Sequence, residues 1–197
     1  MTENSALRRA VIVVALANLA YFFVEMGVAL RIGSVSLLAD GADFFEDAAV
    51  NTLIAVALSW TASRRARVGK LLAFVLLVPA LAFVWTLWRK LGDPTPPAPL
   101  GLGATGLGAL AVNLGCAFLL ARYRAHSGSL TKAAFLSARN DALANVAIIG
   151  AGAVTLATGS IWPDILVGLG IALMNLDAAR EVWEAATREQ LDLDAEP

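Results

Sequence analysis

The sequence predicts an all-α membrane protein, a bundle of six transmembrane helices with both termini in the cytoplasm. Three observations predict this fold class. Of the 197 residues, 58% are hydrophobic and only 16% are charged, with a mean hydropathy of +0.70, whereas soluble domains contain about 25% charged residues. The apolar residues fall into separate runs that approach or exceed the roughly 20 residues needed to cross a bilayer. Lys and Arg gather in alternate connections between those runs.

The first half of the chain contains three of these runs. The first, residues 9–30, is too long for the apolar part of a signal peptide and is followed by further runs, so we expect a retained helix. Gly33 lies in the short turn that leads to the second run, residues 35–60. The third run, residues 71–88, contains Pro79, which should kink its helix.

The second half contains the other three runs. Residues 92–99 are rich in proline and must form a loop. The fourth run, residues 100–121, contains five glycines, which allow helices to approach closely. The fifth and sixth runs cover residues 130–158 and 162–183. We therefore expect an N-terminal tail, a six-span domain and a short polar tail at residues 1–8, 9–186 and 187–197.

The basic residues orient the bundle. Short cytoplasmic connections of membrane proteins carry an excess of Lys and Arg. Here they gather before the first run, after the second and after the fourth. These connections should therefore face the cytoplasm, together with both termini.

The composition also excludes some classes of function. A single cysteine, Cys116, rules out an internal disulfide, and a net charge of −1 gives no support to a nucleic-acid partner. No histidine lies in a predicted span, and no nucleophile–base set or glycine-rich phosphate loop is present. We expect neither an enzyme nor a bound cofactor.

Four acids interrupt the second run, where a single aspartate at the centre of a membrane helix costs about 2.5–3.5 kcal/mol. Asp40, Asp43, Asp47 and Asn51 share one helical stripe roughly 80° wide, with Glu46 beside it. No Lys or Arg lies near the middle of any span to neutralise them. The stripe predicts an intramembrane cation site.

The fifth run supplies a second pair of oxygen groups, Ser137 and Asp141, spaced one helical turn apart like Asp43 and Asp47. Two facing helices that each give two ligands can complete a tetrahedral site. Carboxylates packed this closely cannot all ionise in a low dielectric without a cation. In the absence of metal, protons should therefore replace it. Asp40 and Asn140 are auxiliary ligand candidates.

Some of the intramembrane polar groups have a purely structural alternative. Intramembrane acids can form buried hydrogen bonds between helices, and this alternative is strongest for Glu25, which shares a face with Asn18. Asp164 follows Pro163 at a helix start, which favours a capping role. Helix–helix hydrogen bonds are the expected role of four asparagines: Asn18, Asn113, Asn145 and Asn175.

Two segments resemble the cation diffusion facilitator family. Residues 33–47, GSVSLLADGADFFED, resemble its second helix with an acidic pair at Asp43 and Asp47. Residues 129–146, SLTKAAFLSARNDALANV, resemble its fifth helix, in which Asp141 is the second ligand. Residues 162–173, WPDILVGLGIAL, resemble its last helix. The resemblance covers nearly the whole chain.

The resemblance implies a divalent transition-metal exporter that exchanges metal for protons by alternating access and forms a homodimer. It also implies a histidine where this chain has Ser137, a change that shifts preference towards harder ions. The family usually has a cytoplasmic C-terminal domain, for which we expect no room in the dozen or so residues after the sixth span.

We therefore expect a metal/proton antiporter of the bacterial inner membrane, with Asp43, Asp47, Ser137 and Asp141 as ligands. Zinc is the first choice of metal, and cobalt, iron, manganese and cadmium remain open. The alternative is a degenerate, non-transporting membrane subunit that has lost its ligand histidine.

Overall fold

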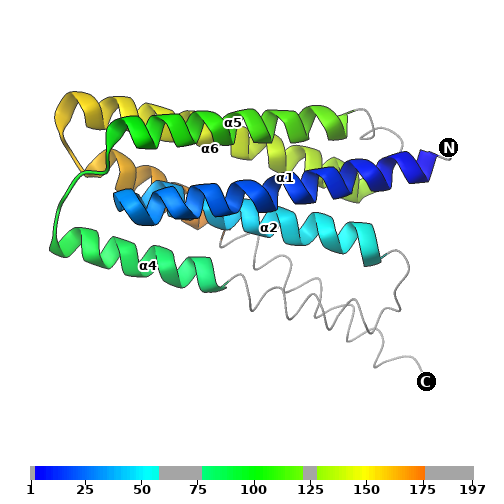
Figure 1. Ribbon diagram of the computed structural model, residues 1–197, viewed down its shortest axis with the longest axis horizontal. Coiled ribbons are helices and arrows are strands. Elements are labelled where there is room, and N and C mark those ends of the chain that lie inside the picture. The colour runs from blue at the N-terminus through cyan, green and yellow to red at the C-terminus, as the bar shows by residue number, and fades with distance from the viewer. Residues whose placement is uncertain (1–2, 58–76, 122–127, 176–197) are drawn as a thin grey trace, which may run out of the picture.

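The computed structural model describes residues 3–57, 77–121 and 128–175, which form six helices (Figure 1). Within these ranges, the side chains of residues 128–139 and of a few others near helix ends lie outside the description. The helices are α1 (Glu3–Ile32), α2 (Val35–Ala57), α4 (Leu77–Gly92), α5 (Pro99–Ala121), α6 (Gly128–Thr158) and the helix Trp162–Asn175.

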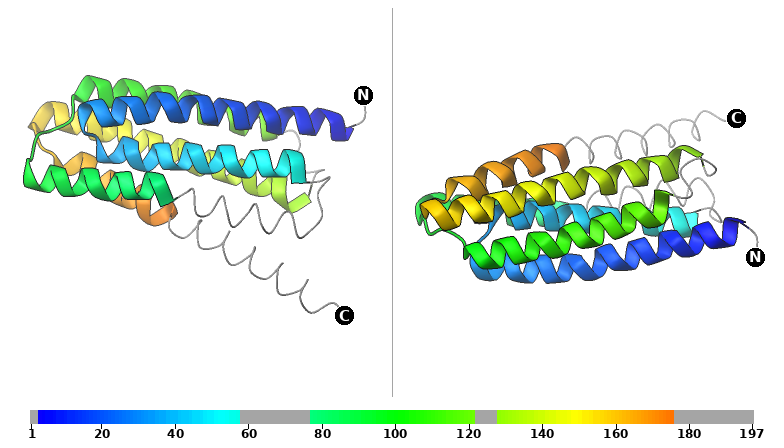
Figure 2. Two further views of the ribbon diagram at one scale, coloured as in Figure 1. Left: turned by 60° about the horizontal axis from the view of Figure 1, so that its bottom comes forward. Right: turned by 90° about the horizontal axis from the view of Figure 1, so that it is seen from above.

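The helices run alternately up and down a single bundle (Figures 1 and 2). Helices α1, α4 and α6 finish at one end, where α2, α5 and the helix Trp162–Asn175 begin. We call this the turn end, because it holds the three short connections at residues 33–34, 93–98 and 159–161. Gly33 and Gly159 both adopt positive φ there, at 65° and 64°, which glycine tolerates without strain.

The observed helices follow the predicted spans closely. The boundaries of α1, α2, α5 and α6 differ from the prediction by a few residues, apart from the first turns of α1 that precede residue 9. Residues 58–60, 71–76 and 176–183 of the predicted spans lie outside the described residues. Within the described ranges, three helical segments are long and apolar enough to cross a membrane, by length and composition: Ala6–Ile32, Pro99–Ala121 and Asn140–Thr158.

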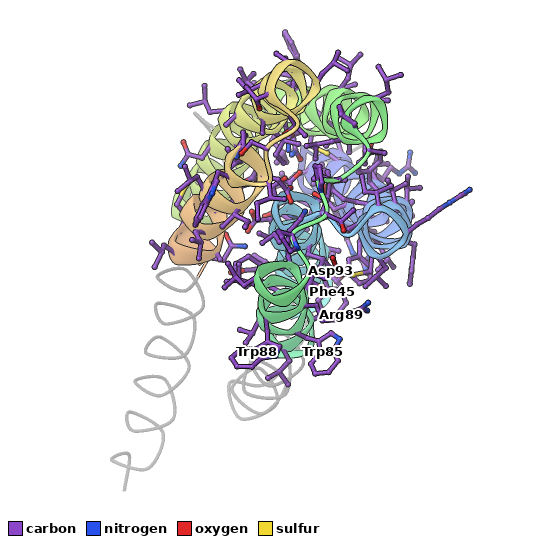
Figure 3. The ribbon with its side chains drawn as sticks, turned by 90° about the vertical axis from the view of Figure 1, so that its left-hand side faces the viewer. Phe45, Trp85, Trp88, Arg89 and Asp93 are labelled. Atoms are coloured by element: carbon purple, nitrogen blue, oxygen red, sulfur yellow. The ribbon has the colours of Figure 1, made fainter. Side chains whose placement is uncertain are left out.

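The outer surface of the bundle is apolar. Trp85 and Trp88 on α4 are 63% and 74% exposed and point away from the other helices (Figure 3). Lipid contact explains this pattern, because a protein in water rarely exposes so much apolar surface. Other large exposed side chains are Leu16, Phe23, Leu107, Phe118 and Leu156.

Close helix approach depends on glycine in α5. A Cβ atom at Gly106 would lie 2.9 Å from Cγ2 of Ile148 on α6, and one at Gly108 would overlap the hydroxyl of Tyr21 on α1. That hydroxyl donates a 2.6 Å hydrogen bond to the carbonyl of Thr105. Small residues therefore hold α5 against both neighbours.

The buried apolar core has two separate parts. One lies towards the turn end and includes Leu37, Leu38, Leu102, Ile148 and Ile165. The other lies towards the opposite end and includes Val11, Val14, Ala55, Leu120 and the free thiol of Cys116. Polar side chains from α1, α2, α5 and α6 occupy the level between these two clusters. The core is therefore interrupted between its two apolar parts.

Candidate cation site

The acidic stripe of α2 lies at this interruption of the core. Asp40 is fully buried, and Asp43 and Asp47 are half-buried on the same helix. Because side chains three and four residues apart share one face of a helix, the three carboxylates line one side of α2. Asp40 on this side accepts a hydrogen bond from Asn145 of α6, so the side faces that helix.

Asp141 of α6 meets this stripe from the opposite helix. The strongest charge–charge interaction of Asp141 is with Asp47, and the next strongest is with Asp40. The strongest charge–charge interaction of Asp43 is with Asp141. The fold thus brings together three of the four predicted ligands, Asp43, Asp47 and Asp141. Ser137 precedes Asp141 by one turn of α6, but its side chain lies outside the described residues.

The two auxiliary candidates occupy different environments. Asn140 is exposed, whereas Asp40 is completely enclosed. Oδ2 of Asp40 accepts a 2.5 Å hydrogen bond from Nδ2 of Asn145, and Oδ1 of Asn145 accepts a 2.9 Å bond from Nδ2 of Asn113. This chain of amides connects α5, α6 and α2, as expected for asparagines at helix contacts. It fixes the orientation of the Asp40 carboxylate.

The acids are neighbours and do not yet form a closed metal cage. Among the described residues, no three His, Cys, Asp or Glu side chains converge tightly enough to hold a metal ion as they stand. Ser137 falls outside that comparison.

The comparison with known families identifies the chain. The cation efflux transmembrane domain matches residues 11–189, which is most of the 197 residues. The chain belongs to the cation efflux family. The resemblance seen in the sequence is thereby confirmed, and the protein is a multi-pass membrane transporter for cations rather than an enzyme. The comparison with curated proteins found no match.

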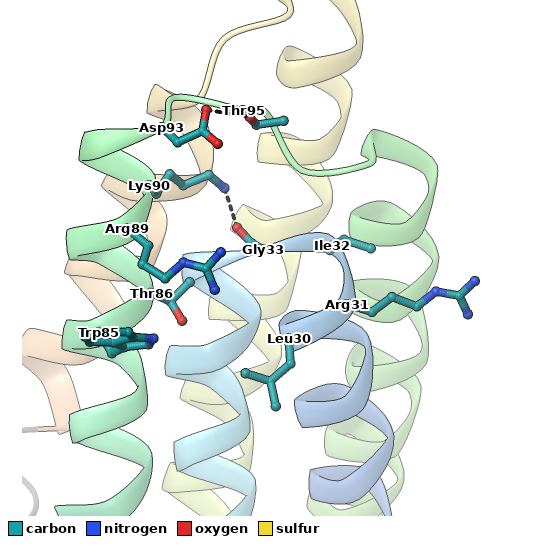
Figure 4. Close-up of a pocket in the computed structure, with 10 residues that line it drawn as sticks. All are labelled: Leu30, Arg31, Ile32, Gly33, Trp85, Thr86, Arg89, Lys90, Asp93 and Thr95. Carbon is teal, nitrogen blue, oxygen red and sulfur yellow. Dashed lines mark hydrogen bonds between the residues drawn. The ribbon is translucent and has the colours of Figure 1, made fainter.

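The cation efflux protein has a second buried polar cluster at the turn end. Asp164 forms a 2.6 Å ion pair with Nζ of Lys90, which also donates a 2.6 Å hydrogen bond to the carbonyl of Gly33 (Figure 4). The Asp164 carboxylate also accepts hydrogen bonds from the hydroxyls of Ser34 and Ser36, at 2.7 Å each, and from the backbone N–H groups of Val35 and Ser36. We call this group the Asp164 network.

The Asp164 network shows both the strength and the limit of sequence reasoning. A capping role for Asp164 is correct, but the helix that it caps is α2, not its own. The ion pair with Lys90 could not be predicted from the sequence, because the two residues are 74 positions apart. Their location at the ends of predicted spans is the one feature that they share in the sequence.

A cavity of about 330 Å³ adjoins Lys90 at the turn end, between the end of α1 and α4 (Figure 4). Arg31, Arg89 and Trp85 are among its lining residues. None of the acids of the candidate cation site lines this cavity. It therefore belongs to the end of the transporter and not to the acidic cluster.

Proposed function

We propose that the protein exports a divalent transition-metal ion in exchange for protons, by alternating access of one site to the two sides of the membrane. Asp43, Asp47 and Asp141 bind the ion, and Ser137 or Asn140 completes the set. The observation that carries this proposal is the meeting of Asp43, Asp47 and Asp141 from two helices at the interruption of the apolar core.

The electrostatics of the cluster support exchange with protons. The single ion pair among the described residues is Lys90–Asp164, at the turn end. Neither Asp40 nor Asp43 therefore has a basic partner in that part of the chain. Several adjacent carboxylates in a low dielectric need positive charge, which either a metal ion or protons can supply. Because the two compete for the same oxygens, binding of one releases the other.

The ligand chemistry limits the choice of ion. Carboxylate and hydroxyl oxygens suit manganese, whereas imidazole suits zinc, copper and iron. Zinc remains the first candidate on the family resemblance, with cobalt, iron, manganese and cadmium as the others. We further propose a homodimer in a bacterial inner membrane, with the turn end facing away from the cytoplasm.

The test is metal-dependent proton movement in proteoliposomes, measured with a pH-sensitive dye inside the vesicles. Asp47→Ala should abolish the signal while the protein elutes from size-exclusion chromatography like the wild type. Asp93→Ala is the control, because Asp93 is exposed in the connection between α4 and α5 and should leave flux unchanged. Wild-type flux in Asp47→Ala would refute the assignment.

One observation favours a second candidate function, a non-transporting membrane subunit. Serine occupies the position of the expected ligand histidine. Isothermal titration calorimetry separates the two functions. A degenerate site should release no heat at micromolar metal, whereas a transporter site should titrate.

A further inference from the structure

Five buried polar atoms at the interruption of the core have no hydrogen-bond partner among the described residues, apart from a side-chain hydrogen bond between Glu25 and Asp40 themselves. They are both carboxylate oxygens of Glu25, Oδ1 of Asp40, and both polar side-chain atoms of Asn18. All three residues are 0% exposed. Since a buried polar group without a partner costs about 1–3 kcal/mol, such a concentration calls for a ligand.

We propose that Glu25 and Asp40 form a second cation site between α1 and α2, occupied by the same class of divalent ion. This inference rests on the proposed function and adds a binding step to it. Asp40 precedes Asp43 by three residues, which is about 4.5 Å along the helix axis. The second site therefore lies on the turn-end side of Asp43, Asp47 and Asp141.

The position of Glu25 is fixed by close packing against α2. A Cβ atom at Gly41 would lie 3.8 Å from Cγ of Glu25, so the glutamate side chain lies against the residue that follows Asp40. The strongest charged neighbour of Glu25 is Asp40, and Asp43 is the next. Two acids from different helices thus face one another in a fully enclosed space.

The orientation of Asp40 leaves one oxygen available for a ligand. Asn145 holds Oδ2, and Asn113 in turn holds Asn145. Oδ1 has no partner among the described residues other than the carboxyl group of Glu25. A carboxylate that is anchored through one oxygen and directs the other at a second acid is preorganised for an ion between the two.

The chemistry of the pair defines its ligand. Two adjacent carboxyl groups attract positive charge, either as a proton that they share or as a cation that replaces it. Oxygen donors suit divalent ions that accept hard ligands. Water molecules would complete the coordination sphere. In the described part of the chain, no Lys or Arg side chain competes with a metal ion for these oxygens, since none is ion-paired with either acid.

Counting bound metal tests the proposal. The purified protein in detergent is dialysed to equilibrium against Zn²⁺, Co²⁺, Mn²⁺ and Cd²⁺ separately, and bound metal is measured by atomic emission. For the ion that binds, the wild type should hold two ions per chain. Glu25→Gln and Asp47→Ala should each hold one. Asp93→Asn is the control and should keep two, because Asp93 is exposed in the connection between α4 and α5 and lies outside both sites.

The outcomes separate this inference from the proposed function. One ion in both the wild type and Glu25→Gln overturns the second site and leaves the antiporter intact. In that case the two acids share a proton and bind no metal. Two ions in both proteins also overturns it. No bound ion of any kind in the wild type overturns the proposed function and the second site together. If Glu25→Gln does not elute like the wild type, Asp40→Asn provides the same count.

Discussion

The two buried polar clusters of this transporter differ in how their atoms are satisfied. The Asp164 network contains one acid and one base, and Asp164 accepts bonds from both serine hydroxyls and two backbone N–H groups. The central acids include Glu25 and Asp40, whose three oxygens have no partner among the described residues except each other's carboxyl group. In the described part of the chain, Asp164 is paired with a base, whereas no base is ion-paired with Glu25 or Asp40.

This difference indicates two roles. A buried charge that is paired and fully hydrogen-bonded holds helices in place. Acids without counter-charges are expensive to bury, and such residues within membrane segments mark ion or proton pathways. The Asp164 network therefore has a structural role, because it holds α2, α4 and the helix Trp162–Asn175 together. The centre of the bundle is where we propose that the transported ion binds.

The largest effect on stability should come from breaking the balanced cluster. Asp164→Ala leaves Lys90 buried without a counter-charge and removes the cap of α2. Loss of one partner of a buried pair costs about 3–5 kcal/mol. Unfolding by SDS in detergent micelles, followed by circular dichroism, measures this cost against Asp93→Ala. A loss below about 1 kcal/mol would mean that the network does not fasten the turn end.

A smaller effect should follow from pushing the same cluster apart. A Cβ atom at Gly168 would lie 2.9 Å from the backbone nitrogen of Ser36, beside the hydroxyl that Asp164 binds. Gly168→Ala should cost about 1–3 kcal/mol, because the helix must move away from α2. Gly170→Ala is the matched control, since a Cβ there has nothing within 4 Å. Equal stability of the two variants would contradict the close approach.

A still smaller effect is expected in the amide chain that holds Asp40. Asn113→Ala removes one hydrogen bond between α5 and α6, which in a membrane is worth about 0.6 kcal/mol. Its cost in the same unfolding assay should therefore be small. If it instead matched Asp164→Ala, the amide chain would be a structural fastening and the two clusters would not differ in kind.

The smallest effect should come from Glu25 in metal-free protein. Glu25→Gln keeps the shape and replaces a carboxyl group that has no hydrogen-bond partner in the described chain other than Asp40. The free energy of unfolding should either fall by less than about 0.5 kcal/mol or increase. A loss of several kcal/mol without metal would show that Glu25 has a structural role and would erase the contrast with Asp164.

Much of the fold could be predicted from the sequence, because a bilayer imposes long apolar runs and a basic bias on their connections. The acidic stripe was equally visible, since Asp40, Asp43 and Asp47 lie at helical spacing in an apolar run. The spacing of Ser137 and Asp141 pointed to α6 as the facing helix. These signals are local, and each depends on residues within two turns of one another.

The remaining features depend on contacts between distant segments. Lys90 and Asp164 are 74 residues apart, and Asp40 and Asn145 are 105 residues apart. Helix periodicity gives the face on which each lies but not the helix that it meets. For the same reason, the sequence alone does not decide between a hydrogen-bonding role and a functional role for Glu25. The structure adds that its buried carboxyl group lies beside Asp40.

The central claim is that Asp43 and Asp141, from two different helices, bind one cation. The most direct measurement is equilibrium metal binding by the double variant Asp43→Asn/Asp141→Asn, compared with the wild type under identical conditions. The account predicts that the double variant loses the ion that Asp47→Ala also loses. Retention of that ion with wild-type affinity would contradict it.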